Sequence, residues 1–450
     1  INAKRRERIA SLQNSSLLSK SLIHDGMDKI AQNIKLKGYD TYFMALSMEH
    51  AAKRTITIES NLPYAIYDYA SGKPLASSCV RSGEGYTIEF EAELPSFGYA
   101  VFGAKAIEKA EVKSWREGNT ISVGNISVTA SEDRVVLNEG GRTTELALAP
   151  FKLKALTEMK DGKGDGEWRD AKQYGPTRTK VCGAELIVDR QIDWLVHMRQ
   201  HFVIEAGRVL CNISFTMPHP TIIRRVGGAA RSFDPRGLDL VISTGKPCKT
   251  VFDIPFGMSE YAKSGEGHFC LLNLCSLEGA DGGLVVMPRS GEQGFSVDAD
   301  KGDMTLYLGA STVSGPIRDV KITFVTPVNV KQEPAWYLEP FHGTYNHSIV
   351  FDTYKGKWQE CNTLQQIKVA SAPVYVHQCL PTKKGSLAPQ GSLLKASSAE
   401  VEITSAEVVE GKLQVRLNER RGKSESVELQ TEKAKSKVEV KPFGIVQHTL

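Results

Sequence analysis

The chain has 450 residues, enough for roughly two to four domains with sizeable cores, and a formal net charge of +4. Lys and Arg are interleaved with Asp and Glu, which argues against a nucleic-acid-binding surface, and no run approaches the roughly 20 apolar residues of a membrane span. The eight cysteines are scattered without metal-ligand spacing, so we expect free thiols, and the cellular compartment stays open.

Residues 1–37 show helical periodicity. Lys and Arg fill one face, and apolar residues recur mostly three or four apart on the other: Ile9, Leu12, Leu18, Leu22, Ile23, Met27, Ile30 and Ile34. We expect an amphipathic helical hairpin or one long helix. Because little else in the sequence is helical and the first residue is Ile, we also expect that part of this packing surface belongs to a domain outside the chain.

From residue 38 onward the apolar period changes to two, as in 55–59, 88–94, 186–192 and 196–204. This period indicates strands with one buried and one solvated face. The predicted fold class is mainly β: a large antiparallel sandwich at 109–372, flanked by a small β-sandwich domain at 38–108 and a C-terminal β-domain at 373–450. Three lysines alternate at 433, 435 and 437, which is typical of a solvated strand face.

Residues 251–298 suggest a sheet with a ligand-facing edge. Two strand-like runs, 269–274 and 284–287, are separated by a Gly/Asp turn and framed by loops at 253–261 and 288–295. The turn at 279–283 lacks both the Lys-Ser/Thr and the helix of a phosphate-binding loop, so it predicts a hairpin. In the second loop, Arg289 could hold a hydroxyl or carboxylate group, and Glu292 could act as an acid. Solvated turn residues are the alternative.

His197, His201 and Glu205 are four residues apart in one predicted strand and therefore share a face. Such a trio could ligate a metal or carry out acid–base chemistry. Residues four apart in a strand are separated by about 13 Å, too far to share one ion. A polar sheet face is therefore the favoured interpretation, and we assign no catalytic or metal-ligating residue.

Aromatic and imidazole side chains gather between residues 336 and 358. Aromatic planes stack on sugar rings, and imidazoles hydrogen-bond sugar hydroxyl groups, so the group suits carbohydrate contact. Ordinary core and loop aromatics remain the alternative. The group comprises Trp336, Tyr337, His342, Tyr345, His347, Tyr354 and Trp358. We take Trp336, His342, Tyr345 and His347, with Arg289 and Glu292, as candidate substrate-contacting residues.

Several segments stand in the same order as in one known family. Residues 94–99 read Leu-Pro-Ser-Phe-Gly-Tyr, 254–257 read Ile-Pro-Phe-Gly, and the closing residues 442–450 read Pro-Phe-Gly-Ile-Val-Gln-His-Thr-Leu. This order resembles the β-rich C-terminal half of the family-38 glycoside hydrolases, the retaining α-mannosidases. Where many members carry an Arg in a Leu-Arg-Ser strand, residues 306–311 read Leu-Tyr-Leu-Gly-Ala-Ser.

The resemblance implies a galactose-mutarotase-like large sandwich that serves as an accessory and carbohydrate-contacting region. It also implies that zinc and the catalytic carboxylates belong to a missing N-terminal catalytic domain, which would be the partner of this chain together with a glycan. No cofactor is expected in the chain itself, which alone should be inactive. The alternatives are a stand-alone carbohydrate-binding or mutarotase- or lyase-like protein, and a scaffold that assembles a homo-oligomer.

Overall fold

The computed structural model describes residues 2–110, 113–149, 152–154, 168–170, 173–192, 196–221, 239–254, 257–261, 266–289, 293–308, 341–382 and 384–450. The described chain is mainly β, as predicted, and its helices are α1 (Asn2–Ala31), α2 (Thr363–Ser371) and the short 3-10 helix η1 (Trp358–Glu360). None of the described helices is long and apolar enough to cross a membrane.

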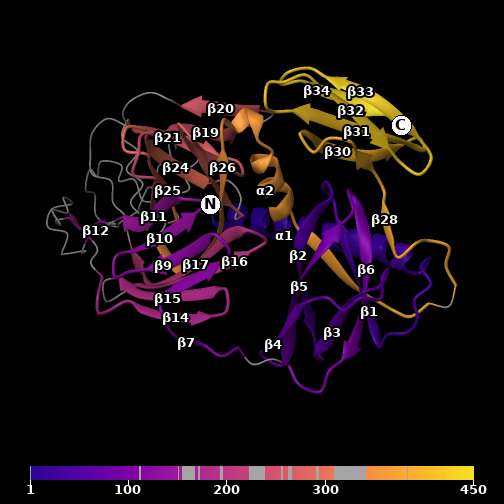
Figure 1. Ribbon diagram of the computed structural model, residues 1–450, viewed down its shortest axis with the longest axis horizontal. Coiled ribbons are helices and arrows are strands. Elements are labelled where there is room, and N and C mark those ends of the chain that lie inside the picture. Colours follow the sequence, from indigo (N-terminus) through magenta and orange to yellow (C-terminus); the bar gives the residue numbers. More distant parts are fainter. Residues whose placement is uncertain are drawn as a thin grey trace, which may run out of the picture. The chain divides into compact units, whose positions relative to one another are not determined.

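The chain forms two compact units (Figure 1). The first unit combines Ile1–Lys113 with Lys368–Leu450, and the second unit is Ser114–Ile367. Residues from both ends of the chain therefore fold together in the first unit. The domain boundaries expected from the sequence, at residues 38, 109 and 373, stay a prediction.

A small sandwich opens the first unit. Its larger sheet has the strand order β27-β1-β6-β28, with β3 also paired to β6, and the smaller sheet has the order β2-β5-β4. Phe43, Ile88 and Phe102 are among the buried residues that join the two sheets into one core. The strands are β1 (Thr41–Ser47), β2 (Ala52–Ser60), β3 (Tyr64–Asp68), β4 (Ser77–Ser82), β5 (Gly85–Leu94), β6 (Gly98–Ala106), β27 (Val374–Cys379) and β28 (Gln390–Ser392).

The helix α1 covers the outer face of the larger sheet. Met27 of α1 packs with Met44 and Val101 of the sheet, so β1 is buried along its whole length. This explains why residues 42–46 read as a continuous apolar run instead of alternating. Residues 2–31 form one long helix and not a hairpin. Its apolar stripe is only partly covered, because Leu18 and Leu22 are each 62% exposed.

The C-terminal residues form a second, smaller sandwich within the first unit. Its three-stranded sheets have the orders β29-β32-β33 and β30-β31-β34, and Val415, Leu417 and Leu429 lie in the shared core. Lys435 and Lys437 of β33 are exposed, which confirms the predicted solvated face. The strands are β29 (Lys395–Ala396), β30 (Val401–Val409), β31 (Lys412–Glu419), β32 (Glu425–Gln430), β33 (Lys435–Val440) and β34 (Ile445–Thr449).

The second unit is a large antiparallel sandwich. One sheet has eight strands in the order β21-β24-β25-β18-β11-β10-β9-β8. These are β8 (Thr120–Val123), β9 (Ile126–Ala130), β10 (Arg134–Glu139), β11 (Arg142–Ala149), β18 (Asp239–Ser243), β21 (Glu266–Leu271), β24 (Gln293–Asp298) and β25 (Asp303–Tyr307). A separate two-stranded sheet pairs β12 (Lys152–Lys154) with β13 (Trp168–Asp170).

The other large sheet has ten strands in the order β20-β19-β22-β23-β26-β17-β16-β15-β14-β7. Buried residues of both large sheets, such as Leu137 and Phe295 from one and Phe202 and Phe351 from the other, form one core. The strands are β7 (Arg116–Glu117), β14 (Arg178–Cys182), β15 (Glu185–Ile192), β16 (Val196–Glu205), β17 (Arg208–Thr221), β19 (Lys249–Ile254), β20 (Gly257–Tyr261), β22 (Cys275–Gly279), β23 (Gly282–Pro288) and β26 (Phe341–Lys355).

Residues 269–274 do not form the single strand expected from the sequence. The strand β21 ends at Leu271 in the eight-stranded sheet, and β22 begins at Cys275 in the ten-stranded sheet. The apolar run therefore crosses from one sheet to the other. The following hairpin is as predicted, because Gly279 of β22 pairs with Gly282 of β23.

Candidate functional site

Three of the six candidate substrate-contacting residues lie close together in the second unit. Arg289 directly follows β23, and its backbone N–H donates to the Ser348 carbonyl of β26 at 2.7 Å. Tyr345 and His347 belong to β26. His342 is described only as a backbone position of the same strand, and Glu292 and Trp336 lie outside the described residues.

Tyr345 and His347 face the interior of the large sandwich. The ring of Tyr345 stacks on Phe215 of β17, with centroids 5.0 Å apart, and His347 lies parallel to the same ring at 6.1 Å. The imidazole Nε2 of His347 lies 2.7 Å from the carbonyl of Leu308, the residue after β25, so Nε2 carries a proton and donates it. His347 therefore connects the two large sheets. Burial lowers the pKa of His347 and favours the neutral ring.

Arg289 presents a charged group at the end of β23. Its side chain as a whole is exposed, yet desolvation around the guanidinium lowers the pKa of Arg289, with the charge of Glu205 opposing this effect and that of Arg208 adding to it. Since an arginine stays protonated in proteins, Arg289 is a cation able to hold a carboxylate or hydroxyl group.

Two aromatics of the sequence cluster are core residues. Tyr354 and Trp358 are 4% and 3% exposed. The Tyr354 hydroxyl donates to Glu278 Oε2 at 3.0 Å, and the Trp358 indole N–H donates to Glu260 Oε1 at 2.7 Å. Lys249 Nζ lies within 3.2 Å of Glu260 and 2.9 Å of Glu278. The indole hydrogen bond and the neighbouring Lys249 lower the pKa of Glu260. The two rings are therefore held in the core by acidic side chains of β20 and β22 and offer no face to a sugar.

His197 and His201 each have an acidic neighbour on β15. His201 Nε2 lies 3.0 Å from Glu185 Oε2, and His197 Nε2 lies 3.7 Å from Asp189 Oδ1, an oxygen that also accepts from Arg199. Across the described part of the chain, no group of three or more His, Cys, Asp and Glu could hold a metal. His197 is 58% exposed and His201 30% exposed, and each lies beside its own carboxylate, as on a polar sheet face, while the lack of a metal-ligating role stays a prediction. The cysteines whose side chains the structure describes are free thiols, as expected.

Asp253, which precedes the Ile-Pro-Phe-Gly sequence, stabilises the fold through hydrogen bonds that the sequence did not predict. Its carboxylate is fully buried and accepts the backbone N–H groups of residues 272–274 at 2.9–3.1 Å, while Oδ2 accepts the side-chain amide of Asn273. These bonds satisfy the donors where the chain crosses between sheets. A carboxylate just before the sequence Ile-Pro-Phe-Gly was the available signal, but the groups that it binds lie about 20 residues further along the chain.

A carboxyl pair, also missed, lies at one end of the large sandwich. Burial, with the charge of Asp352 as a second cause, raises the pKa of Glu139 to about 7. Burial also raises the pKa of Asp352, while Arg208 opposes this through an ion pair of 3.0 Å. Two neighbouring carboxyl groups with one cation favour sharing a proton.

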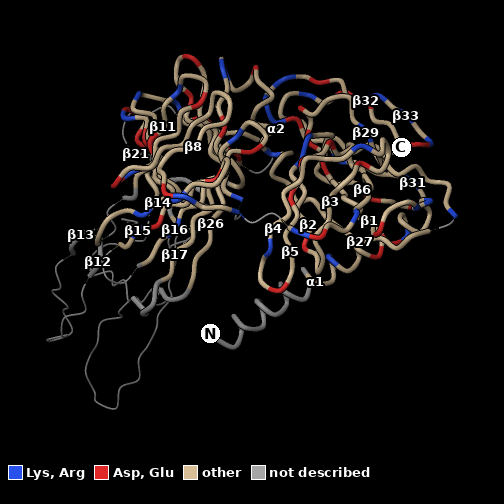
Figure 2. Tube along the Cα trace, turned by 60° about the horizontal axis from the view of Figure 1, so that its bottom comes forward, with Lys and Arg blue, Asp and Glu red and all other residues tan. Residues whose placement is uncertain are grey.

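Charged groups also gather inside the first unit. Lys368 and Arg420 both contact Glu402, the latter at 3.2 Å. Burial raises the pKa of Glu402, but the two cations outweigh it and lower the pKa overall. Nearby Glu49 has its pKa raised to about 7, mainly by burial. Over the described chain as a whole, basic and acidic residues are mixed, as Figure 2 shows.

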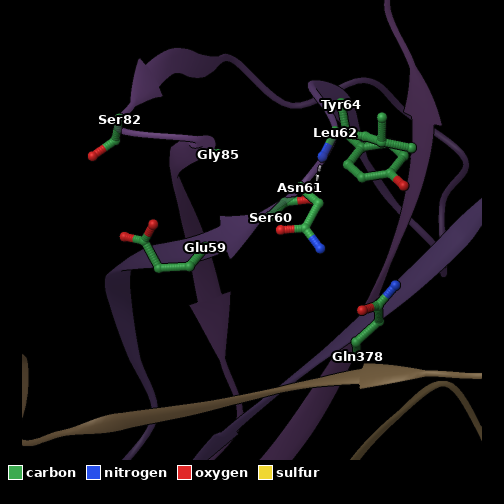
Figure 3. A pocket seen from close by; sticks show the side chains of 8 residues that line it. All are labelled: Glu59, Ser60, Asn61, Leu62, Tyr64, Ser82, Gly85 and Gln378. Atoms are coloured by element: carbon green, nitrogen blue, oxygen red, sulfur yellow. Dashed lines mark hydrogen bonds between the residues drawn. The ribbon is translucent and has the colours of Figure 1, made fainter.

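The first unit also carries a polar pocket of about 470 Å³ (Figure 3), which the sequence did not indicate. Its lining includes Glu59, Asn61, Tyr64 and Gln378. The amide of Gln378 points toward Asn61 in Figure 3 and donates to the Thr41 hydroxyl at 3.0 Å, and Glu59 accepts the Thr87 hydroxyl. Amide and carboxylate groups of this kind can hydrogen-bond sugar hydroxyl groups.

Comparisons with known proteins identify solved structures with a similar fold. No family model and no curated protein matches this sequence. A solved structure described as an alpha-mannosidase from Enterococcus faecalis V583 matches with a TM-score of 0.66 at 12% identity, covering 99% of this chain and 60% of that chain.

A second structure, described as a protein of glycosyl hydrolase family 38 from Enterococcus faecalis, also gives a TM-score of 0.66, at 13% identity, and covers 99% of this chain and 62% of that chain. The chain thus spans less than two thirds of the length of both matched structures. The structural resemblance predicted from the order of sequence segments is confirmed, and the chain has the fold found in a large part of these two proteins.

Proposed function

We propose that this chain is the accessory β-rich region of an α-mannosidase-like glycoside hydrolase, which cleaves α-mannosidic bonds in glycans with a catalytic domain outside the chain. The observation that supports this most is the fold likeness over 99% of the chain to structures described as an alpha-mannosidase and a family 38 glycosyl hydrolase. Fold alone does not fix chemistry, so the assignment depends on the side chains as well.

The side chains of the described residues favour support over catalysis. The fold family implies zinc, and a catalytic zinc needs three protein ligands converging on one ion. His197 and His201 instead lie beside separate carboxylates of β15 and do not fit such a site. We therefore derive no step through zinc in this chain and assign the metal to the proposed catalytic domain.

Glycan contact is proposed at two places. In the second unit, Arg289 is exposed and charged beside β26, where His342 also lies. In the first unit, the polar pocket offers the amides of Asn61 and Gln378 and the carboxylate of Glu59. Hydroxyl-rich ligands suit both, because each site combines donors and acceptors at the surface.

The partner surface is proposed on α1. Leu17, Leu18 and Leu22 are 62–65% exposed on the described part of this helix, while Met27 further along is fully buried. Exposed leucines gathered on one helix are typical of an interaction surface. We propose that these leucines contact the catalytic domain. Self-association through the same leucines is the competing outcome, and gel filtration of Leu18→Gln with Leu22→Gln distinguishes it, because only a homo-oligomer changes size.

The proposal is tested by assaying the purified chain with an aryl α-mannoside, with and without added zinc. No zinc-dependent release of nitrophenol is expected, and clear turnover would overturn the proposal. The second candidate, a stand-alone carbohydrate-binding protein, is favoured by the pocket in the first unit. It predicts calorimetric binding of mannose oligosaccharides that Gln378→Ala weakens in the isolated chain.

A further inference from the structure

A pair of histidines joins α1 to the sheet of the first unit. His24 Nδ1 lies 3.2 Å from His377 Nδ1 of β27, and the rings are 5.4 Å apart with a tilt of 51°. His377 Nε2 lies 2.7 Å from Asp28 Oδ1. His24 and Asp28 are one helical turn apart, so one face of α1 brings both to the same imidazole.

The contact with Asp28 determines how His377 is protonated. A carboxylate accepts hydrogen bonds only, so the neutral His377 ring carries its proton on Nε2 and has a lone pair on Nδ1. That lone pair points toward Nδ1 of His24. The His377 side chain is 19% exposed, which leaves its ring partly shielded from water. Either a proton or a cation can occupy the space between the two nitrogens.

We propose that His24 and His377 form a binding site for a divalent transition-metal ion such as Zn²⁺ or Cu²⁺. Bonds of about 2.0–2.1 Å in tetrahedral geometry place two nitrogen ligands about 3.3 Å apart, close to the separation of 3.2 Å in the structure. Imidazole is a preferred ligand of Zn²⁺, Cu²⁺ and Ni²⁺. Binding therefore needs loss of the shared proton and little movement of the rings.

Asp28 completes the arrangement as a positioning residue. A histidine that binds a metal commonly donates its other ring N–H to a carboxylate, which fixes its tautomer and raises its basicity. Within the described residues, no third His, Cys, Asp or Glu joins the pair as a ligand, so water would fill the remaining positions. The site is consequently weaker than a four-ligand structural zinc site, and it would tie α1 to β27.

The test uses the full chain without an affinity tag, stripped with a chelator, and isothermal titration with ZnCl₂ at pH 7.5. One saturable equivalent is expected, together with a rise in melting temperature that MgCl₂ does not produce. His24→Ala and His377→Ala should abolish both effects, and Asp28→Asn should weaken binding by about tenfold or more. His197→Ala, an exposed histidine in the second unit, is the matched control and should leave binding unchanged.

Two further measurements separate loss of metal binding from loss of the fold. Circular dichroism in chelator checks that each variant is folded, and His24→Gln, which keeps a polar group, replaces any variant that is not. The absorption of bound Co²⁺ reports nitrogen ligation directly. The proposal is wrong if the wild-type chain binds no zinc saturably, or if His24→Ala and His24→Gln bind as well as the wild type.

Discussion

Two buried carboxylate regions of the second unit differ in how their charge is satisfied. The carboxylate of Asp253 accepts three backbone N–H groups and one side-chain amide. Glu139 lies near a second carboxyl group, Asp352, and its pKa is raised to about 7. Asp253 is fully and Glu139 partly buried, and the groups around each carboxylate determine whether its charge stabilises or destabilises the fold.

The largest expected effect is the loss of Asp253. Asp253→Ala leaves the N–H groups of residues 272–274 without their acceptor, and we expect a loss of about 3 kcal/mol in the free energy of unfolding. Asp253→Asn keeps one acceptor oxygen and should lose less than half as much. Urea unfolding measures both. Equal losses for the two variants would show that the hydrogen bonds do not hold the crossing between the sheets.

His347 extends the comparison to a buried imidazole. His347→Ala removes the hydrogen bond to Leu308 and the contact with Phe215, and should cost about 2 kcal/mol at pH 7.5. Burial lowers the pKa of folded His347 below 6.5, so its contribution to stability is complete above the pKa of the unfolded state and is lost as pH falls through the lower pKa of the folded state. The difference between wild type and variant in urea unfolding should shrink at pH 5. A constant difference would contradict the neutral inter-sheet link.

Removing the charge of Glu139 should stabilise the protein, whereas removing the carboxylate of Asp253 should destabilise it. Its pKa is raised from 4.5 to about 7, so the folded state prefers the protonated form, and stability falls as pH rises from about 5 to 8. Glu139→Gln removes the charge and should stabilise the protein by about 1 kcal/mol at pH 8, after allowance for solvent screening, with no gain at pH 5. Thermal unfolding at the two pH values checks this. A destabilised variant at pH 8 would mean that the carboxylate is satisfied like Asp253.

The smallest expected change in stability is that of a substitution on the solvated face of β33. Lys437 is 71% exposed and lies 3.9 Å from Glu439, whose side chain is also exposed. Lys437→Gln should change the free energy of unfolding by less than about 0.5 kcal/mol. Chemical denaturation of this variant gives the reference for the three changes above, and a larger loss would show that the face is packed in solution.

Local patterns predicted the fold because periodicity is a local property. The alternation in residues 186–192 appears in β15 as alternating buried positions, and the continuous apolar run at 42–46 lies in β1, which is buried between a core and α1. The crossing at residues 272–274 could not be predicted, because the same apolar run serves two sheets. Only the distant acceptor Asp253 marks the break.

The candidate site was harder to predict, because the face on which a side chain lies depends on strand pairing. Tyr345 and His347 are aromatic and polar, as a glycan site requires, but pairing with β17 turns both toward Phe215. The Glu139 and Asp352 pair and the pocket at Gln378 join residues more than 200 positions apart in sequence. Residue spacing in the sequence does not predict contacts over such separations. The glycan contacts predicted for all six candidates stay predictions: Arg289, Glu292, Trp336, His342, Tyr345 and His347.

The central claim is that this chain supports a catalytic domain without carrying the chemistry itself. The most direct measurement is aryl α-mannoside hydrolysis by this chain, by the proposed catalytic domain expressed separately, and by the two together. We predict zinc-dependent turnover when both are present and none for this chain alone. Introducing Leu18→Gln and Leu22→Gln into α1 should reduce the turnover of the mixture. Hydrolysis by this chain alone, or full activity of the proposed catalytic domain without this chain, would contradict the claim.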